Sequence, residues 1–129
     1  TLPTPAIAGL NAALKYTAEN GDENRNRLNG LFYYTMGELS KISGVRLYTR
    51  KEYGGPIIAF TVRGMTSAEA GNILADEYDI CVRTGLHCAP LAHKHYGTLK
   101  DGMVRAAVGI ENTADEINFF LQAVSEIAR

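Results

Sequence analysis

The sequence predicts a small α+β domain, built from a largely antiparallel sheet with helices packed on one face. The expected order is helix, helix, strand, strand, helix, strand, long loop, strand, helix, which lacks the regular alternation of a parallel α/β fold. The 129 residues, 46% of them apolar and 21% charged, are enough for one core and too few for two ordinary domains. We therefore expect residues 1–129 to form a single domain.

Composition excludes several classes of protein. The net charge is −1 with acidic and basic residues interspersed, so no basic stripe predicts nucleic-acid binding. No apolar run approaches the roughly 18 residues of a membrane span, and no signal-peptide pattern opens the chain. Two cysteines do not form a disulfide framework, so a cytoplasmic location is expected. The first residue, Thr1, is not methionine, which fits either processing or a segment of a longer protein.

Two successive helices are expected over the first 44 residues. Thr4 can cap the first helix, Pro5 suits its first turn, and Gly21 is expected to end it. Asp22 then opens a longer helix that Gly44 closes. Each helix carries an apolar stripe at helical spacing, which we interpret as core. The stripes include Ile7, Leu10, Leu14, Leu28, Leu31, Phe32, Leu39 and Ile42.

Four segments have the character of strands: residues 45–48, 57–62, 80–83 and 103–108. The segment 57–62 is the best of them, because it is rich in β-branched and aromatic residues. Residues 53–56 are expected to form a turn between the first two strands, because they contain glycine and proline.

Two further helices are marked by capping boxes, in which a threonine is followed three residues later by a glutamate. Thr66 and Glu69 begin the helix between the second and third strands, and Thr113 and Glu116 begin the last helix. The apolar faces of these helices consist of Ala70, Ile73, Leu74 and Tyr78, and of Ile117, Phe120, Leu121, Val124 and Ile127.

Residues 84–102 show neither a helical nor a strand period. Loops longer than about 12–15 residues inside a compact domain are usually functional or disordered. This segment holds Cys88 and all three histidines of the chain, with His87 directly before the cysteine. A thiol beside an imidazole suggests reactive sulfur chemistry. Cys81 lies in an apolar strand segment and is expected to be buried, which leaves Cys88 as the candidate reactive thiol.

Strand parity places two arginines on one face of the sheet. Val104 and Val108 should face the helices, so Arg105 between them points to the uncovered face. Arg83 has the same orientation in the preceding strand. Both arginines border the Cys88 loop, where a guanidinium can hold a carboxylate or phosphate by two parallel hydrogen bonds. Solvated or ion-paired arginines are the alternative, but the shared location favours anion binding.

Several motifs carry a resemblance to a known family. They are Arg-Thr-Gly-x-His-Cys at residues 83–88, Val-Arg-Ala at 104–106 and Asn-Thr-x-x-Glu-Ile at 112–117. Together they resemble the C-terminal small domain of cysteine desulfurases and selenocysteine lyases. These are class V aminotransferase enzymes of fold type I, which use pyridoxal phosphate (PLP). The opening residues 1–10 are similar to the segment where that domain begins, so the resemblance covers nearly the whole chain.

The resemblance implies a role for each candidate residue. Cys88 would be the nucleophile that takes sulfur from PLP-bound L-cysteine and becomes a persulfide while alanine leaves. Arg105 would hold the substrate carboxylate, and Arg83 would lie near the entrance of the active site. His87, beside Cys88, is assigned to substrate binding. Thr1 would reach the cofactor phosphate of the partner subunit.

The resemblance also implies what surrounds the chain. The full-length enzyme would be a homodimer, and a sulfur-acceptor protein is a possible partner. PLP would be bound mainly by the large domain of the family, which supplies the cofactor lysine, a ring-stacking histidine and an aspartate. Since that domain is absent from this sequence, the isolated chain is expected to be inactive. Leu86 stands where many relatives have a second histidine.

Two alternatives remain open. The chain could belong to a class V aminotransferase or selenocysteine lyase that acts on another amino acid. It could instead be a zinc-binding or interaction module that uses Cys81, His87, Cys88, His93 and His95. Zinc sites usually pair their ligands at short, regular spacings, and Cys81 and Cys88 are too far apart for such a pair. No metal site is therefore predicted.

Overall fold

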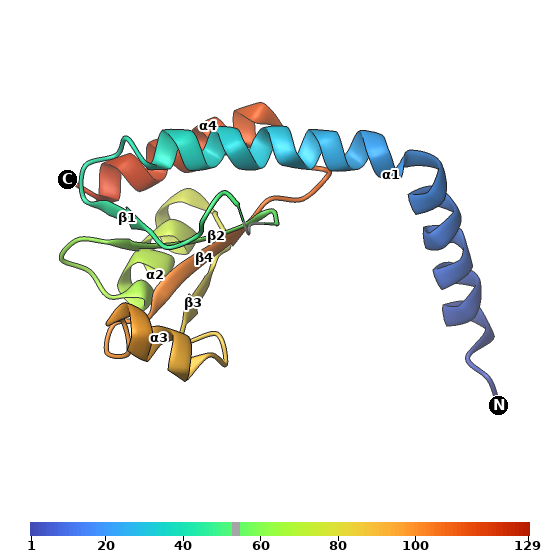
Figure 1. Ribbon diagram of the computed structural model, residues 1–129, viewed down its shortest axis with the longest axis horizontal. Helices are drawn as coiled ribbons and strands as arrows, with labels where there is room; N and C mark the ends of the chain where they lie inside the picture. The colour runs from blue at the N-terminus through green and yellow to red at the C-terminus, as the bar shows by residue number, and fades with distance from the viewer. Residues whose placement is uncertain (53–54) are drawn as a thin grey trace.

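The computed structural model describes residues 1–52 and 55–129, and within them it confirms the predicted α+β fold. An antiparallel sheet of four strands has the order β1-β2-β4-β3. Figure 1 shows α1 and α4 running side by side along one side of this sheet, with α3 at its far end. The strands are β1 (Val45–Leu47), β2 (Ile57–Val62), β3 (Arg83–Gly85) and β4 (Met103–Ala107).

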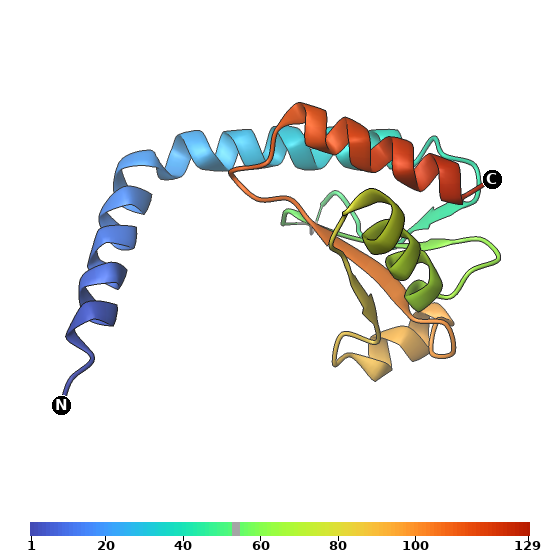
Figure 2. The same ribbon diagram turned by 180° about the vertical axis from the view of Figure 1, so that it is seen from behind.

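The helices are α1 (Thr4–Leu39), α2 (Ser67–Tyr78), α3 (Pro90–Tyr96) and α4 (Ala114–Ile127). One apolar core lies between the sheet and α1, α2 and α4. Its most buried large side chains include Phe32, Leu39, Ile58, Phe60, Leu74, Val104 and Val124. The view from behind shows α2 below α4 in front of the sheet (Figure 2), and the rings of Phe60 in β2 and Phe120 in α4 meet directly. None of the helices in the described ranges is both long enough and apolar enough to span a bilayer.

The two predicted N-terminal helices are one helix. Gly21 and Asp22 lie inside α1, and the helix continues to Leu39. A glycine inside a helix costs only about 1 kcal/mol relative to alanine, which is too little to end a helix that no proline interrupts. Figure 1 shows a sharp bend in the N-terminal half of α1, the half that contains Gly21. Gly21 therefore lies within one continuous helix and does not end it.

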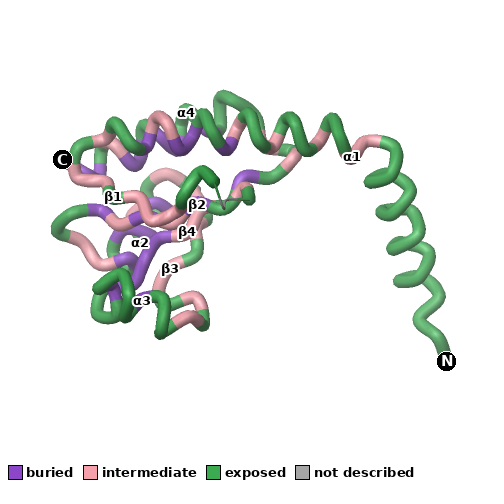
Figure 3. The backbone as a smooth tube through the Cα atoms, viewed as in Figure 1, coloured by how far each residue is buried: buried purple, intermediate pink, exposed green. Residues whose placement is uncertain are grey.

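The apolar stripe of the first predicted helix is not part of the core, so that interpretation was wrong. Leu10 and Leu14 are each 61% exposed and Ile7 is 50% exposed. We call the part of α1 before the bend the α1 arm. Figure 3 shows this arm as exposed throughout, while the C-terminal half of the helix contributes buried positions. Phe32 and Leu39 of that second half are buried as predicted. The pattern identified an apolar face correctly but could not say whether the chain itself covers it.

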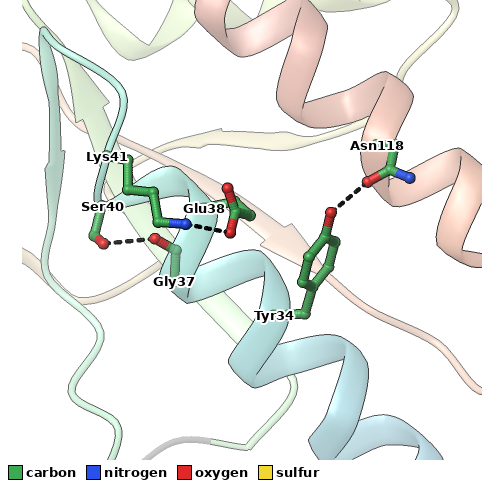
Figure 4. A network of polar contacts seen from close by, with 6 residues as sticks. All are labelled: Tyr34, Gly37, Glu38, Ser40, Lys41 and Asn118. Carbon is green, nitrogen blue, oxygen red and sulfur yellow. Dashed lines mark hydrogen bonds and ion pairs between the residues drawn. The ribbon is translucent and has the colours of Figure 1, made fainter.

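A polar contact ties α1 to α4 outside the core (Figure 4). The hydroxyl of Tyr34 donates a hydrogen bond of 2.7 Å to Oδ1 of Asn118.

Both predicted capping boxes are confirmed: the side chains of Thr66 and Thr113 accept from the amides of Glu69 and Glu116. The glutamate carboxylates accept in return from the threonine amides, each at 2.8 Å.

Two predictions around the Cys88 loop need correction. The predicted strand 80–83 is shifted: β3 covers Arg83–Gly85, and residues 80–82 lie outside the ladder. The loop contains helix α3, which at seven residues is too short to show an apolar period. Pro90 suits its first turn and Gly97 caps it in a left-handed conformation. The predicted turn at 53–56 lies partly outside the described residues.

Gly102 provides a test of the packing behind this loop. Its φ is +69°, and a Cβ there would lie 2.5 Å from Oγ of Ser67 and 2.8 Å from Cα of Gly85. Gly102→Ala should destabilise the fold by about 3 kcal/mol, from the left-handed backbone and the overpacking together. Gly64→Ala is the matched control, since its φ is +82° but the space around it is open. That variant should lose about 1 kcal/mol in urea unfolding. Equal losses would contradict the close approach at Gly102.

Candidate active site

Cys88 lies on a tight turn between β3 and α3. The amide of Ala89 donates to the carbonyl of Leu86 over 2.8 Å, which closes the turn around His87 and Cys88. Both of those residues have left-handed backbones, with φ of 52° and 59°. Such angles are uncommon for residues with a side chain and persist where the surroundings hold them. The turn leaves the thiol of Cys88 exposed to solvent.

The two predicted arginines are direct neighbours across the sheet. Arg83 of β3 pairs with Arg105 of β4, and residues opposite each other on antiparallel strands share a face. The prediction that both point to the same face is confirmed by this register. The one ion pair among the described residues joins Lys41 to Glu38, so neither arginine is neutralised by a carboxylate there. Two like charges directly opposite each other are unfavourable alone and favour a bound anion.

His87 lies between β3 and α3. Its Nε2 lies 3.3 Å from the carbonyl oxygen of Arg83, and its ring centroid is 5.9 Å from that of His93. Burial lowers the pKa of His87, the hydrogen bond to the Arg83 carbonyl opposes this, and the charges of Arg105, Arg83 and His93 lower it further. The imidazole of His87 is therefore biased toward its neutral form, which can accept a proton.

The base of the loop is held by Ser67, a residue that the sequence reasoning missed. Oγ of Ser67 donates to the carbonyl of Asp101 (2.7 Å) and accepts from the amide of Gly85 (3.1 Å). The amide of Ser67 donates to the same Asp101 carbonyl at 2.8 Å. One buried hydroxyl thus joins the end of β3 to the segment that leads into β4. Because Ser67 joins these two segments, Gly102 must approach Ser67 closely. No residue spacing in the sequence predicts this arrangement.

The position of Cys81 corrects the prediction that it is buried. It is exposed, because α2 ends at the left-handed Asp79 and the chain joins the ladder only at Arg83. Cys81 borders a cavity of about 450 Å³ between the sheet, α2 and α4. The lining also includes Tyr78 and Phe119. Cys88 is not part of this lining, so the two thiols occupy separate environments.

The remaining candidates do not assemble at Cys88. Thr1 is exposed at the tip of the α1 arm, far from α3 in both views (Figures 1 and 2). His95 is exposed on α3, whereas His93 is buried. Within residues 1–52 and 55–129, no three histidine, cysteine or acidic side chains converge as a metal site would require.

Comparisons with known proteins identify the family of this chain. The model of the family described as Aminotransferase class-V matches residues 1–120. The chain belongs to the class-V aminotransferase family. Among curated members, the cysteine desulfurase of Pectobacterium atrosepticum is 34% identical over 127 residues, covering 98% of this chain. The cysteine desulfurase of Escherichia coli O157:H7 is 32% identical over the same length. This class-V aminotransferase chain spans about 30% of the length of these relatives.

Solved structures show the same fold. The cysteine desulfurase of Thermococcus onnurineus, solved without ligand, superimposes with a TM-score of 0.83 at 28% identity over 93% of this chain. The Escherichia coli desulfurase CsdA gives 0.83 at 25% identity over 98%. The enzyme C-DES, solved with glycine covalently linked to its PLP cofactor, gives 0.74 at 21% identity and supports the fold alone. The chain covers 30%, 31% and 30% of these three chains.

The exposure of both cysteines gives a direct prediction. Native protein should react with a thiol reagent such as DTNB at two positions without denaturant, since both thiols are exposed. Cys81→Ser and Cys88→Ser should each leave one reactive thiol in the folded state. Release of a single equivalent from the native wild-type chain, with the second appearing only in urea, would restore the interpretation of Cys81 as a core residue.

Proposed function

We propose that this chain is the C-terminal small domain of a PLP-dependent cysteine desulfurase. The supporting observation is the Cys88 turn itself, where an exposed thiol on a left-handed backbone adjoins His87. This turn follows β3 directly, so Cys88 lies close in the chain to Arg83, which pairs with Arg105 across the sheet. The identities of 34% and 32% to cysteine desulfurases support the same reaction.

The proposed reaction transfers sulfur from L-cysteine to Cys88. The thiolate of Cys88 attacks the sulfur of the substrate, so a sulfur–sulfur bond forms and the carbon–sulfur bond breaks. The electron pair of the broken bond stays with the carbon fragment, which takes up a proton and leaves as L-alanine. Cys88 keeps the sulfur as a persulfide, from which a sulfur-acceptor protein can take it. His87, which favours its neutral form, can accept the thiol proton.

Arg105 is assigned to the carboxylate of the substrate. It is half-buried on the central part of the sheet, where β4 lies between β2 and β3, so its backbone is firmly held. A guanidinium binds a carboxylate through two parallel hydrogen bonds, which fixes both position and orientation. Arg83, exposed on the edge strand beside it, is assigned to the entrance of the site.

The residues of this chain do not by themselves fit PLP. The lysines are Lys15, Lys41, Lys51, Lys94 and Lys100, and all of them are exposed. Lys41 is paired with Glu38 on α1, as Figure 4 shows. PLP supplies an electron sink for bond breaking at an amino-acid substrate. We therefore infer that further parts of the enzyme bind the cofactor, and that this domain contributes the thiol and the arginines.

We infer further that the complete enzyme is a cytoplasmic homodimer. The α1 arm supports an intersubunit role for Thr1, because it carries this residue far from the Cys88 turn of its own chain (Figure 1). The exposed Leu10 and Leu14 give the arm an apolar face that another protein surface can cover. In such an assembly, Thr1 would contact the cofactor phosphate bound by the partner subunit.

Variants of the complete enzyme test the assigned roles. With PLP and L-cysteine, Cys88→Ser should abolish both alanine release and the persulfide seen by mass spectrometry, while Cys81→Ser should retain both.

Arg105→Ala should lose several kcal/mol of transition-state stabilisation in kcat/KM, because a charge-assisted pair of roughly 2–5 kcal/mol is lost. Arg46→Ala, an exposed arginine on β1, is the matched control. An unchanged kcat/KM in Arg105→Ala would remove this residue from the site.

The isolated chain should be inactive. When purified residues 1–129 are mixed with PLP and L-cysteine, alanine should not rise above the level of a Cys88→Ser control. Absorbance from enzyme-bound PLP should disappear on dialysis, because the exposed lysines are not set in a cofactor site. Alanine release above the control, or a cofactor band that survives dialysis, would show that the chain is a complete enzyme.

A further inference from the structure

Buried polar side chains are concentrated behind the Cys88 turn. In the described part of the chain the buried polar residues are Thr35, Ser67, His93 and Thr98. The hydroxyl of Thr35 bonds the carbonyl of Leu31 one turn earlier in its own helix, at 2.7 Å. The other three form a framework for residues 84–102: His93 and Thr98 lie within this segment, and Ser67 of α2 bonds to Gly85 and Asp101 near its ends. Burying a polar group is costly unless it is hydrogen-bonded, and an apolar side chain could fill such a position instead. We therefore expect these buried polar side chains to have a role beyond packing.

His93 is the most buried member of this framework, with 3% of its surface exposed. Its Nδ1 lies 2.9 Å from Oγ1 of Thr98, and its carbonyl accepts from the amide of Thr98, also at 2.9 Å. The carbonyl of Thr98 in turn accepts from the amide of Gly102 at 2.9 Å, directly before β4. The imidazole of His93 is thus anchored to the strand that carries Arg105.

The ring of His93 also meets the ring of His87. The two ring centroids are 5.9 Å apart and the planes are tilted by 52°, which is close ring contact. His87 also approaches the carbonyl of Arg83 through Nε2. A carbonyl can only accept, so Nε2 of His87 carries a proton, and Nδ1 is the basic position of the neutral ring. Two contacts, one from β3 and one from α3, therefore fix the orientation and the tautomer of His87.

We propose that His93 is a positioning residue for the thiol chemistry of Cys88, acting by holding the ring of His87 against the carbonyl of Arg83. The proposal rests on the proposed function for the chemistry, and on the ring contact and the Thr98 anchor for the mechanism. Without the ring of His93, His87 would turn away from Arg83 and gain water. Its pKa would then rise, since burial is the largest cause that lowers it.

The charged and titratable groups that act on His87 come from three elements. They are Arg83 of β3, Arg105 of β4 and His93 of α3. Both arginines remain in a His93 variant, so their effect on His87 is constant across the comparison. A change in the titration of His87 can then be assigned to the loss of the His93 ring.

The test is an NMR titration of the 129-residue chain with labelled histidine, without PLP or L-cysteine. In the wild type, the Cε1–H resonance of His87 should titrate below pH 6.5, and the ring should carry its proton on Nε2. His93→Asn keeps a side-chain amide, which can donate or accept, near the position of Nδ1 for Thr98 but removes the ring. It should move the midpoint up toward 6.5 and mix the tautomers of His87. His95→Asn, an exposed histidine of the same helix, is the matched control and should change neither.

Two further measurements keep the proposal falsifiable if His93→Asn does not fold. Thr98→Val keeps the ring of His93 but removes its anchor, and should shift the midpoint of His87 in the same direction by a smaller amount. A nuclear Overhauser effect between the two rings should be present in the wild-type chain. Equal midpoints in His93→Asn and His95→Asn would overturn the proposal. With an unfolded His93→Asn, a missing ring–ring effect or an unshifted Thr98→Val would do the same.

These outcomes are separate from the proposed enzyme activity. A shifted midpoint with no persulfide in the complete enzyme would reject the desulfurase reaction while leaving the action of His93 on His87 intact. An unshifted midpoint with persulfide formation at Cys88 would reject the role of His93 alone.

Discussion

The hydroxyl of Ser67 closes the Cys88 loop at its base, and the rest of the candidate site depends on this closure. It holds Gly85 and Asp101 together, so that the strands carrying Arg83 and Arg105 remain in register at the point where the loop leaves the sheet. Because the side chain of Ser67 is buried, loss of either partner would leave an unpaired polar group in the interior. The thiol, the imidazole and the guanidinium groups are thus placed by a contact that touches none of them.

Much of the fold could be predicted from the sequence because its signals are local. The capping boxes at Thr66 and Thr113 and the β-branched run of β2 each depend on residues a few positions apart. The alternation that placed Arg105 with Arg83 also needed only the strand period. The candidate nucleophile could be identified for a similar reason, since Cys88 and His87 are adjacent and lie in a segment without periodicity.

The rest could not be predicted because it depends on tertiary contacts. Gly21 looks like a helix end from its neighbours, whereas the continuation of α1 is decided by the cost of a single glycine within a long helix. Cys81 looks buried from its apolar neighbours, but β3 begins two residues later and leaves it outside the ladder. The contacts of His93 and Ser67 could not be predicted from the sequence, since their partners Thr98, Gly85 and Asp101 are known only once the loop is folded.

The lengths and order of the strands have a consequence for how this domain can meet other proteins. The sheet order places β1 and β3, each of three residues, at the two edges, with the longer β2 and β4 inside. An edge so short offers few free backbone groups to an incoming strand, and the charged Arg46 and Arg83 at the two edges discourage such pairing further. The domain is thereby protected against growth of its sheet into a fibril or a swapped dimer. Any specific partner must recognise it through side chains, which can change from one enzyme to the next without disturbing the sheet.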